Sequence, residues 1–386
     1  MARYDAFDVL KSVTSVEDLR KIAKRRVPRA FFQYADHGSY TQSTMRANRA
    51  DLEKIKLRQR VGIDVGKRDL STTIAGERAA LPLVLAPIGM LGMQHGDGEI
   101  LACRAAQAGE VPFCLSTMSI ASIEDVAAAV PGPFWFQLYM IRDRGFVRDL
   151  IARAIAAKCS VLVPTLDLNV LGVRYCDVKN GLTVPISLSA ANLIDVATKP
   201  EWAAGVARAK RKTFGNLAGH VRGMEGVNSL SAWISKQFDP TLTWKDIEWV
   251  REQWPGKLVL KGILDVEDAK IAAKTGATGI VVSNHGGRQL DGAPSSISML
   301  PKIADAVGSE LELLFDGGVR SGQDVFRALA LGARACMIGR AYVYGLGAGG
   351  QEGVAKALEI IRDQLDITMA LTGSTSVAKL ERSVLA

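Results

Sequence analysis

The sequence has few of the features that define a secreted, disulfide-bonded or membrane-spanning protein. Its five cysteines stand far apart, at positions 103, 114, 159, 176 and 336, a scatter that suits free thiols in a reducing compartment. The longest apolar stretch, 81–93, is broken by Pro82 and Pro87 and is too short to cross a bilayer. The N-terminus lacks the basic start and cleavage site of a secretory signal. We therefore expect a cytoplasmic protein.

Cofactor and nucleic-acid motifs are scarce as well. No group of His, Cys and carboxylate residues has metal-ligand spacing, and no glycine fingerprint for a dinucleotide precedes an early helix. Only four histidines occur, at 37, 95, 220 and 285, so few residues are available as a base near neutral pH. The formal charge is +8, and basic residues concentrate in 20–29 and 208–222. Neither cluster matches a nucleic-acid module; a solvated face and an anionic membrane surface remain as interpretations of the second.

A βα pattern recurs along the chain. Four windows, 104–116, 153–165, 271–283 and 327–339, each combine an alanine-rich helix end, a turn and an apolar strand. Turn residues bound eight candidate strands, at 82–86, 112–116, 134–138, 160–166, 257–262, 278–283, 311–316 and 335–339. Continuous apolar strands are typical of parallel sheets covered by helices. We expect an α/β fold, a single (β/α)₈ TIM barrel over 1–386, with a doubly wound open sheet as the alternative.

The positions of polar residues favour the barrel over the open sheet. They follow the apolar runs at Gln137, Tyr139, Thr165, Asp167, Lys261, Ser283, His285, Asp316 and Arg340, and in a barrel all these strand ends meet on the side where active sites form. Two segments break the regular spacing. An N-terminal helical segment includes a helix that Ser15 caps, with Asp18 completing a capping box. A long insertion, about 175–256, follows the fourth strand, and a loop of this length in a compact domain is usually functional or disordered.

His285 is the strongest candidate for a catalytic base. It follows an apolar strand in the segment SNHGGRQLD, 283–291, where glycines let the backbone approach a ligand closely. Arg288 can hold a carboxylate through two hydrogen bonds while His285 handles a proton. Lys261 ends the fifth strand and can stabilise negative charge on a reduced flavin ring. A structural histidine in a capped turn and a surface lysine are the alternatives.

Glycine-rich loops after the last two strands predict a phosphate site. They read FDGGVRSG at 315–322 and IGRA at 338–341, and backbone N–H groups and arginines in these positions of a barrel bind phosphate. Asp316 would repel a phosphate, so we expect it to orient His285 and to stabilise its imidazolium; a helix cap is the alternative. Without a dinucleotide or metal motif, FMN is favoured as the redox agent.

These segments together resemble the FMN-dependent α-hydroxy-acid dehydrogenase/oxidase family, which includes bacterial L-lactate dehydrogenase, glycolate oxidase and mandelate dehydrogenase. The resemblance spans about residues 15 to 380. Its most specific segment is SNHGGRQLDG, 283–292. Supporting segments are APIGM (86–90), LSTMS (115–119), WFQLY (135–139), VLKG (259–262), DGGVRSG (316–322) and IGRA (338–341).

The resemblance implies a role for each matching residue. Tyr34 and Arg288 would hold the substrate carboxylate, and Tyr139 would face the substrate oxygen. Arg174 would be the second arginine near the mouth of the pocket. Asp167 would be a carboxylate that acts together with Arg174 and Tyr139. His285 would be the base, with Asp316 as its partner. The implied FMN contacts are Pro87, Ile88, Gly89, Ser116, Gln137, Thr165, Lys261, Ser283, Asp316, Gly318, Arg320, Gly339 and Arg340.

The implied activity is oxidation of a small L-2-hydroxy acid, with L-lactate favoured, to the 2-oxo acid. Electrons would then pass from FMN to a quinone or cytochrome of the respiratory chain. An oxidase that uses oxygen and releases hydrogen peroxide is the alternative. A phosphate-binding barrel isomerase, an IMP dehydrogenase-like enzyme and a non-enzymatic flavin-binding barrel are more distant. We expect a homotetramer; the residues leave hydride transfer and a carbanion both open.

The insertion around 182–226 is expected to attach the protein to the inner face of the cell membrane as a peripheral protein. It pairs apolar with basic residues: Leu193, Ile194, Trp202, Phe214 and Leu217 with Arg208, Lys210, Arg211, Lys212 and Arg222. Apolar side chains that enter the headgroup region and basic side chains that contact anionic lipids can together hold a protein at a membrane surface. A cover over the barrel mouth and an oligomer interface are compatible with the same residues.

A few positions depart from the pattern usual in the family. The segment VPTLDLNVLGVRY, 163–175, carries Leu166, Asn169 and Val170 near the mouth, and Gly89 stands where many relatives have Ala. Extra room at Gly89 would alter oxygen reactivity or admit bulkier substrates. We expect Gly89, Met118 and Leu171 to line an apolar pocket for the substrate side chain.

Overall fold

Eight parallel strands form the centre of the molecule, as expected from the sequence. The computed structural model describes residues 6–182, 187, 189–219 and 227–386. In spatial order the strands are β3 (Leu83–Leu85), β10 (Ala335–Ile338), β9 (Glu312–Asp316), β8 (Gly279–Val282), β7 (Lys257–Ile263), β6 (Val161–Thr165), β5 (Trp135–Tyr139) and β4 (Cys114–Ser116). A parallel bridge between Leu85 and Phe113 links the two outer strands. The TIM barrel is therefore confirmed, and each strand lies within two residues of its expected place.

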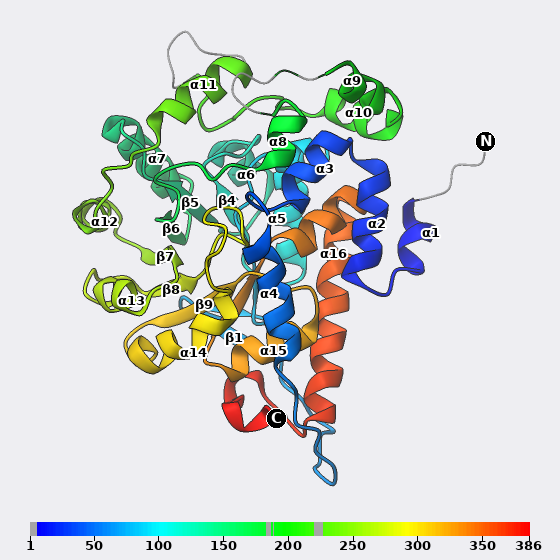
Figure 1. Ribbon diagram of the computed structural model, residues 1–386, viewed down its shortest axis with the longest axis vertical. Helices are drawn as coiled ribbons and strands as arrows, with labels where there is room; N and C mark the ends of the chain where they lie inside the picture. The colour runs from blue at the N-terminus through cyan, green and yellow to red at the C-terminus, as the bar shows by residue number, and fades with distance from the viewer. Residues whose placement is uncertain (1–5, 183–186, 188, 220–226) are drawn as a thin grey trace.

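Helices surround the strands on the outside (Figure 1). They are α5 (Gly98–Ala108), α6 (Ile123–Ala129), α7 (Arg144–Ala156), α12 (Trp244–Gln253), α13 (Val266–Ala273), α14 (Ser296–Val307), α15 (Gly322–Ala330) and α16 (Arg340–Leu371). The strands are buried on both faces because one face meets these helices and the other faces the barrel interior. Glycines at 349 and 350 leave the helical conformation and kink α16.

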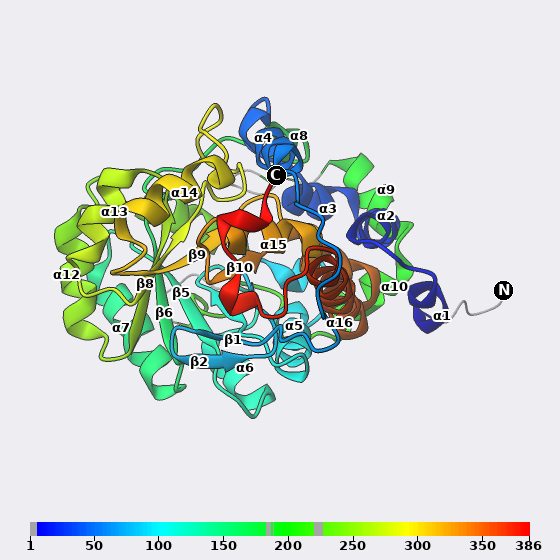
Figure 2. The ribbon, with the colours of Figure 1, turned by 90° about the horizontal axis from the view of Figure 1, so that it is seen from below.

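A β-hairpin that the sequence did not suggest closes the amino-terminal end of the barrel. It consists of β1 (Thr72–Ile74) and β2 (Glu77–Ala79), and it lies across the end seen from below in Figure 2. Ile74, Ala75 and Ala79 pack against the apolar side chains inside the barrel. The backbone N–H of Ala75 donates to Glu312 Oε1 at 2.8 Å, which ties the hairpin to β9.

The first three N-terminal helices contact α16, and the fourth contacts α14 and α15. They are α1 (Ala6–Lys11), α2 (Val16–Arg26), α3 (Arg29–Asp36) and α4 (Ser43–Lys54). Ser15 caps α2 as expected, accepting from the N–H of Asp18 at 3.2 Å. The expected capping box is incomplete because Asp18 Oδ2 accepts from the Ser15 hydroxyl and the N–H of Thr14 rather than from the N–H of Ser15.

The insertion after β6 contributes four helices near the barrel mouth (Figure 1): α8 (Tyr175–Lys179), α9 (Ala190–Ala197), α10 (Pro200–Arg208) and α11 (Val227–Gln237). The expected boundary at 256 is too late, because α12 packs beside α7 through the Arg144–Asp246 ion pair and is the barrel helix before β7.

Short 3₁₀ turns occur at Leu91–Met93, Val377–Lys379 and Arg382–Val384. Within the described ranges, no helix has the length and apolar character needed to traverse a bilayer.

Candidate active site

One large pocket, about 760 Å³ in volume, opens at the carboxyl ends of the barrel strands. Ligand pockets in this fold form at that end because the loops after the strands converge there. Most of the residues predicted for the site line it: Tyr34, Pro87, Ile88, Gly89, Ser116, Tyr139, Arg174, Lys261, His285, Arg288, Asp316, Gly318, Arg320, Gly339 and Arg340. Gln137, Thr165, Asp167 and Ser283 lie behind this lining and contact it.

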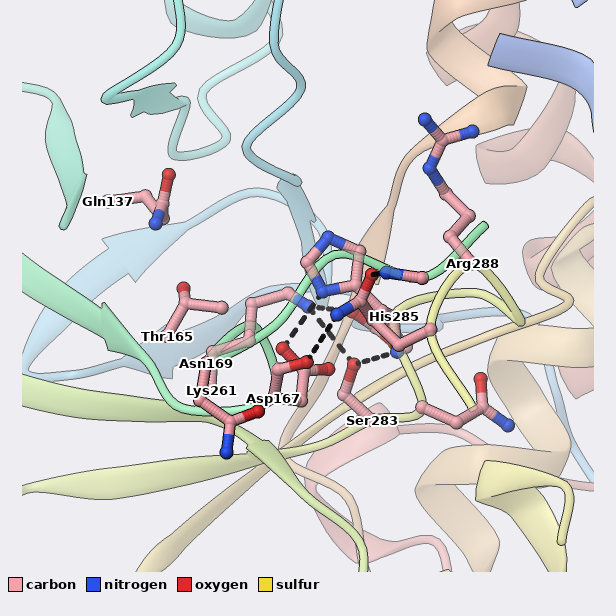
Figure 3. Close-up of polar contacts among 12 residues, drawn as sticks. Gln137, Thr165, Asp167, Asn169, Lys261, Ser283, His285 and Arg288 are labelled. Atoms are coloured by element: carbon pink, nitrogen blue, oxygen red, sulfur yellow. Dashed lines mark hydrogen bonds and ion pairs between the residues drawn. The ribbon is translucent and has the colours of Figure 1, made fainter. Parts of the chain in front are cut away.

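His285 is held by Asp167, and not by Asp316 as we had expected. Its Nδ1 lies 2.9 Å from Asp167 Oδ1, as Figure 3 shows. Burial alone would raise the pKa of Asp167, but His285 and Lys261 lower it below its ordinary value, so the carboxylate is ionised. With Nδ1 directed at Asp167, Nε2 is the ring nitrogen left for a ligand in the pocket.

Asp316 instead forms a buried ion pair with Lys261, at 3.0 Å between Oδ2 and Nζ. Lys261 Nζ also donates to Ser283 Oγ at 3.0 Å. Burial works to lower the pKa of Lys261, yet the carboxylates of Asp316 and Asp167 raise it above its ordinary value. The ammonium group is therefore a permanent charge at the centre of the strand ends, with β7 as its support.

The loop that carries His285 is fixed by residues that the sequence did not single out. Asn48 on α4 and Asn284 exchange two side-chain hydrogen bonds of 2.8 Å, and both are buried. Gly262 has a φ of +97°, and a Cβ there would lie 2.6 Å from Asp167 Cγ, so only glycine lets Asp167 approach β7. The motif VLKG contained this glycine, whereas nothing in the sequence linked Asn48 to Asn284.

A cluster of positive charge surrounds Tyr34 at the pocket mouth. The guanidinium carbons of Arg288 and Arg174 lie 4.9 Å and 5.4 Å from the centre of the Tyr34 ring. Arg288 also donates to the backbone oxygens of Tyr34 and His37, and Arg174 pairs with Asp177 at 2.5 Å. Burial and the nearby Arg174 lower the pKa of Arg288. An anion bound here would relieve this repulsion.

Tyr139 completes the mouth from the end of β5. Its ring contacts Phe238 edge-on, at 6.1 Å between the centroids. Burial and the carboxylate of Asp167 raise the pKa of the Tyr139 phenol well above its ordinary value. The phenol is therefore a hydrogen-bond donor at any physiological pH.

The deeper part of the pocket fits the ring of a flavin. Among the described residues in or just after β5, β6 and β9, three buried polar atoms have no partner: Gln137 Nε2, Asp167 Oδ2 and Asp316 Oδ1. Unpaired buried polar atoms are costly, and a polar ring in the pocket would supply partners. Thr165 pairs with Lys261 across β6 and β7, and Pro87, Ile88 and Gly89 form the facing wall.

The far end of the pocket fits a phosphate group. The first turn of α16 begins at Gly339, where a Cβ would meet only Ile88 Cδ1, at 3.4 Å. Gly318 and Arg320 come from the loop after β9. Burial and the nearby Arg320 and Arg288 lower the pKa of Arg340 to about 9. A helix N-terminus beside closely spaced arginines is an anion site.

The fold and this pocket define a TIM-barrel protein with one binding site for a polar ring that carries a phosphate and a second site for a small anion. The sequence matches the family of FMN-dependent dehydrogenases over residues 23–386, and the chain belongs to that family. It is 51% identical to L-lactate dehydrogenase of Caulobacter vibrioides over 375 residues, covering 97% of this chain and 98% of the relative.

Other relatives share the full length of the chain. L-lactate dehydrogenase of Haemophilus influenzae is 46% identical over 374 residues, with 97% of this chain and 98% of the relative covered. The crystal structure of the monotopic membrane protein (S)-mandelate dehydrogenase superposes with a TM-score of 0.92 at 34% identity, covering 97% and 99% of the two chains. Mandelate oxidase with (S)-4-hydroxymandelic acid gives 0.82 at 38% identity, covering 97% and 98%.

Proposed function

We propose that the protein oxidises L-lactate to pyruvate with FMN as its redox group. The observation that carries this proposal is the His285–Asp167 pair, which faces the pocket beside the positive cluster of Tyr34, Arg174 and Arg288. A base and an anion site in this arrangement suit a 2-hydroxy acid. The L-lactate dehydrogenases among the relatives, at 45–51% identity, support lactate over larger hydroxy acids.

The residues at the mouth would bind and orient the substrate. Arg288 and Tyr34 hold its carboxylate, with Arg174 adding positive charge, so that the 2-hydroxyl group faces His285 and Tyr139. His285 Nε2 accepts a proton, and the ionised Asp167 stabilises the resulting imidazolium. This role of His285 is the same whether the carbon-bound hydrogen leaves as a hydride or as a proton.

The strand ends would hold the cofactor. FMN supplies the acceptor for the two electrons of the oxidation. Lys261, kept protonated by Asp316, places a positive charge beside the ring, and Gln137, Ser116, Thr165 and Ser283 give it polar contacts. Gly318, Arg320, Gly339 and Arg340 would bind the phosphate, and Pro87, Ile88 and Gly89 would lie along the ring.

A lipid-soluble quinone is the electron acceptor that the outer pocket fits best, rather than oxygen. Apolar side chains from α3, the 3₁₀ turn Leu91–Met93, the insertion and α11 continue the lining: Phe31, Met93, Phe214, Ile234 and Phe238. A two- or three-carbon acid does not need this apolar space, whereas an aromatic acceptor does.

We also propose that the protein is peripheral on the membrane, through a smaller surface than the sequence suggested. Phe214 and Leu217 are buried, and Lys210 and Arg211 pair with Asp125. Arg222 lies outside the described residues. Leu193 and Ile194 on α9 are 58% and 67% exposed and remain as apolar groups for lipid contact. The mandelate dehydrogenase relative, a monotopic membrane protein, supports this placement.

Anaerobic reduction of the bound flavin tests the catalytic proposal. The purified holoenzyme should be yellow, and its visible band should bleach with L-lactate faster than with a panel of other L-2-hydroxy acids. Reoxidation by a short-chain quinone should outpace reoxidation by oxygen. Absence of bleaching would reject the catalytic role, and faster reaction with oxygen would make the protein an oxidase.

Flotation with anionic liposomes tests the membrane proposal. The intact protein should float at low salt, whereas Leu193→Glu/Ile194→Glu should remain in the soluble fraction with unchanged flavin reduction. Recovery of both proteins in the soluble fraction would contradict the attachment. Size-exclusion chromatography with light scattering would test the proposed homotetramer.

A further inference from the structure

The segment that returns from the insertion, residues 210–217, contacts the loop after β4, and the polar side chain at this contact, Asn216, is fully buried. Asn216 Nδ2 lies 3.2 Å from the backbone oxygen of Ser116, 3.3 Å from that of Thr117 and 3.0 Å from Ser119 Oγ. Its Oδ1 accepts from the N–H of Ile123 at 2.9 Å. Both ends of the amide are therefore used, and the surrounding atoms fix its orientation.

The backbone beside Asn216 fits into the same loop without spare room. The N–H of Gly215 lies 3.2 Å and 3.1 Å from the oxygens of Ser119 and Ile120. A Cβ on Gly215 would come within 2.5 Å of the backbone nitrogen of Ser122. The return segment is thus inserted into the bend between β4 and α6, and it determines the position of that bend.

The bend in turn orients Gln137 on the neighbouring strand β5. Gln137 Oε1 accepts from Ser116 Oγ at 3.2 Å and from the N–H of Thr117 at 3.3 Å. These two residues are the ones whose carbonyl groups Asn216 holds. Because Oε1 is engaged, Nε2 is left as a buried donor with no partner in the described part of the chain, and it is the atom that a polar cofactor ring would satisfy.

We propose that Asn216 is a positioning residue for the cofactor: it fixes Ser116 and Thr117, which orient the Gln137 amide toward the bound ring. This role rests on the proposed function, since it requires FMN in the pocket. It also gives the insertion a part in building the barrel site, because Asn216 lies beyond α10 and before α11, outside the βα units of the barrel. Asn216 itself does not line the pocket.

Titration of the apoprotein with FMN tests the proposal, with quenching of FMN fluorescence as the readout. Asn216→Ala should bind FMN about tenfold more weakly than the parent and should shift the visible band of the bound flavin toward that of the free cofactor. Asn192→Ala is the matched control, since Asn192 is also buried on the insertion but bonds to Asn180 and Arg29; its FMN affinity should be unchanged.

A double-mutant cycle separates positioning from general loosening of the fold. Gln137→Met removes the donor at constant length, and Asn216→Ala combined with it should bind FMN no more weakly than Gln137→Met alone. Additive losses, or equal losses in Asn216→Ala and Asn192→Ala, would overturn the role of Asn216. Should Asn216→Ala not fold, Asn216→Ser, which keeps one donor, replaces it in the same cycle. Failure of the parent to bind FMN would instead overturn the proposed function, and this role with it.

Discussion

The pocket lies between two walls that are held in place by different forces. The strand-end wall, formed by Lys261, Asp167 and the residues after β8 and β9, consists of ion pairs that each join the ends of two strands across the strand between them, all within one hydrogen-bonded sheet. The insertion wall, formed by the return segment and α11, is joined to the barrel by Asn216 and by the contacts of Lys210 and Arg211 with Asp125.

The two walls therefore suit two tasks: the strand-end wall suits proton transfer, and the insertion wall suits the entry of the electron acceptor. Groups that move protons need fixed geometry, and neighbouring strands supply it because register and hydrogen bonds leave the strand ends little freedom. The cations of the two pairs with Asp125 are largely exposed, and ion pairs with exposed side chains contribute only about 0–1 kcal/mol each, so these pairs hold the insertion wall less firmly than the sheet holds the strand ends. We expect changes in the strand-end wall to affect catalysis most.

The largest effect is expected for His285→Gln. Flavin reduction by L-lactate should slow by about a thousandfold, since general base catalysis contributes roughly 10²–10⁴-fold, while FMN remains bound through Lys261 and the phosphate residues. Stopped-flow absorbance under anaerobic conditions measures this directly. Near-normal reduction would mean that His285 does not transfer the proton. It would also contradict the expectation that the strand-end wall matters most for catalysis.

The two carboxylates of the strand-end wall should behave differently. Asp167→Asn should slow flavin reduction by about 100-fold, whereas Asp316→Asn should act mainly on the flavin spectrum through Lys261.

The pH dependence follows from the ionisation of Asp167. Because its pKa is lowered in the folded protein, the ionic contribution of Asp167 is present above its unfolded pKa and is lost only as pH falls through the folded value. Asp167 therefore stays ionised between about pH 6 and pH 8, and the slower flavin reduction of Asp167→Asn should be present throughout this range. Equal effects of both variants would contradict the assigned partners.

Arg288→Lys should have an intermediate effect. A lysine keeps the charge but loses the planar fork that can hold a carboxylate with two bonds, so kcat/KM for L-lactate should fall by about 10- to 100-fold. The loss should appear mainly in KM if Arg174 keeps the anion near the mouth. Unchanged steady-state kinetics would mean that another residue holds the carboxylate.

The smallest effect is expected for Asp125→Asn, in the insertion wall. An asparagine at position 125 can still accept the hydrogen bonds that cap α6. It loses the ion pairs with Lys210 and Arg211, which should lower the free energy of unfolding by about 1 kcal/mol. Denaturant unfolding should detect this change, while flavin reduction by L-lactate stays near the parent rate. A large loss of reduction would mean that the insertion wall is as critical as the strand ends.

The sequence predicted the barrel well because its evidence was local. Each strand was an apolar run bounded by turn residues, and each was confirmed to within two residues. The β1–β2 hairpin was missed because its three-residue strands are too short to form a pattern. The expected insertion included the barrel helix α12, because tryptophans occur in α10, α11 and α12 alike and gave no boundary between them.

Contacts between distant segments were harder to predict than the site itself. Asp167 and Asp316 both follow strands, and the sequence does not say which of them Lys261 will engage. In the structure, Gly262 lets Asp167 lie close to β7, which leaves it beside His285. Phe214 and Leu217 looked like lipid-contacting residues because burial under α6 and the β4 loop cannot be read from hydrophobicity alone.

The hairpin at the amino-terminal end of the barrel has a kinetic consequence. With Ile74, Ala75 and Ala79 packed on the apolar interior, lactate, pyruvate and the electron acceptor all have to use the mouth at the opposite end. An enzyme with one shared entrance completes one half-reaction and releases its product before the next partner arrives. The steady-state rate law should accordingly be of the double-displacement type, with parallel lines in double-reciprocal plots and competition between pyruvate and the acceptor.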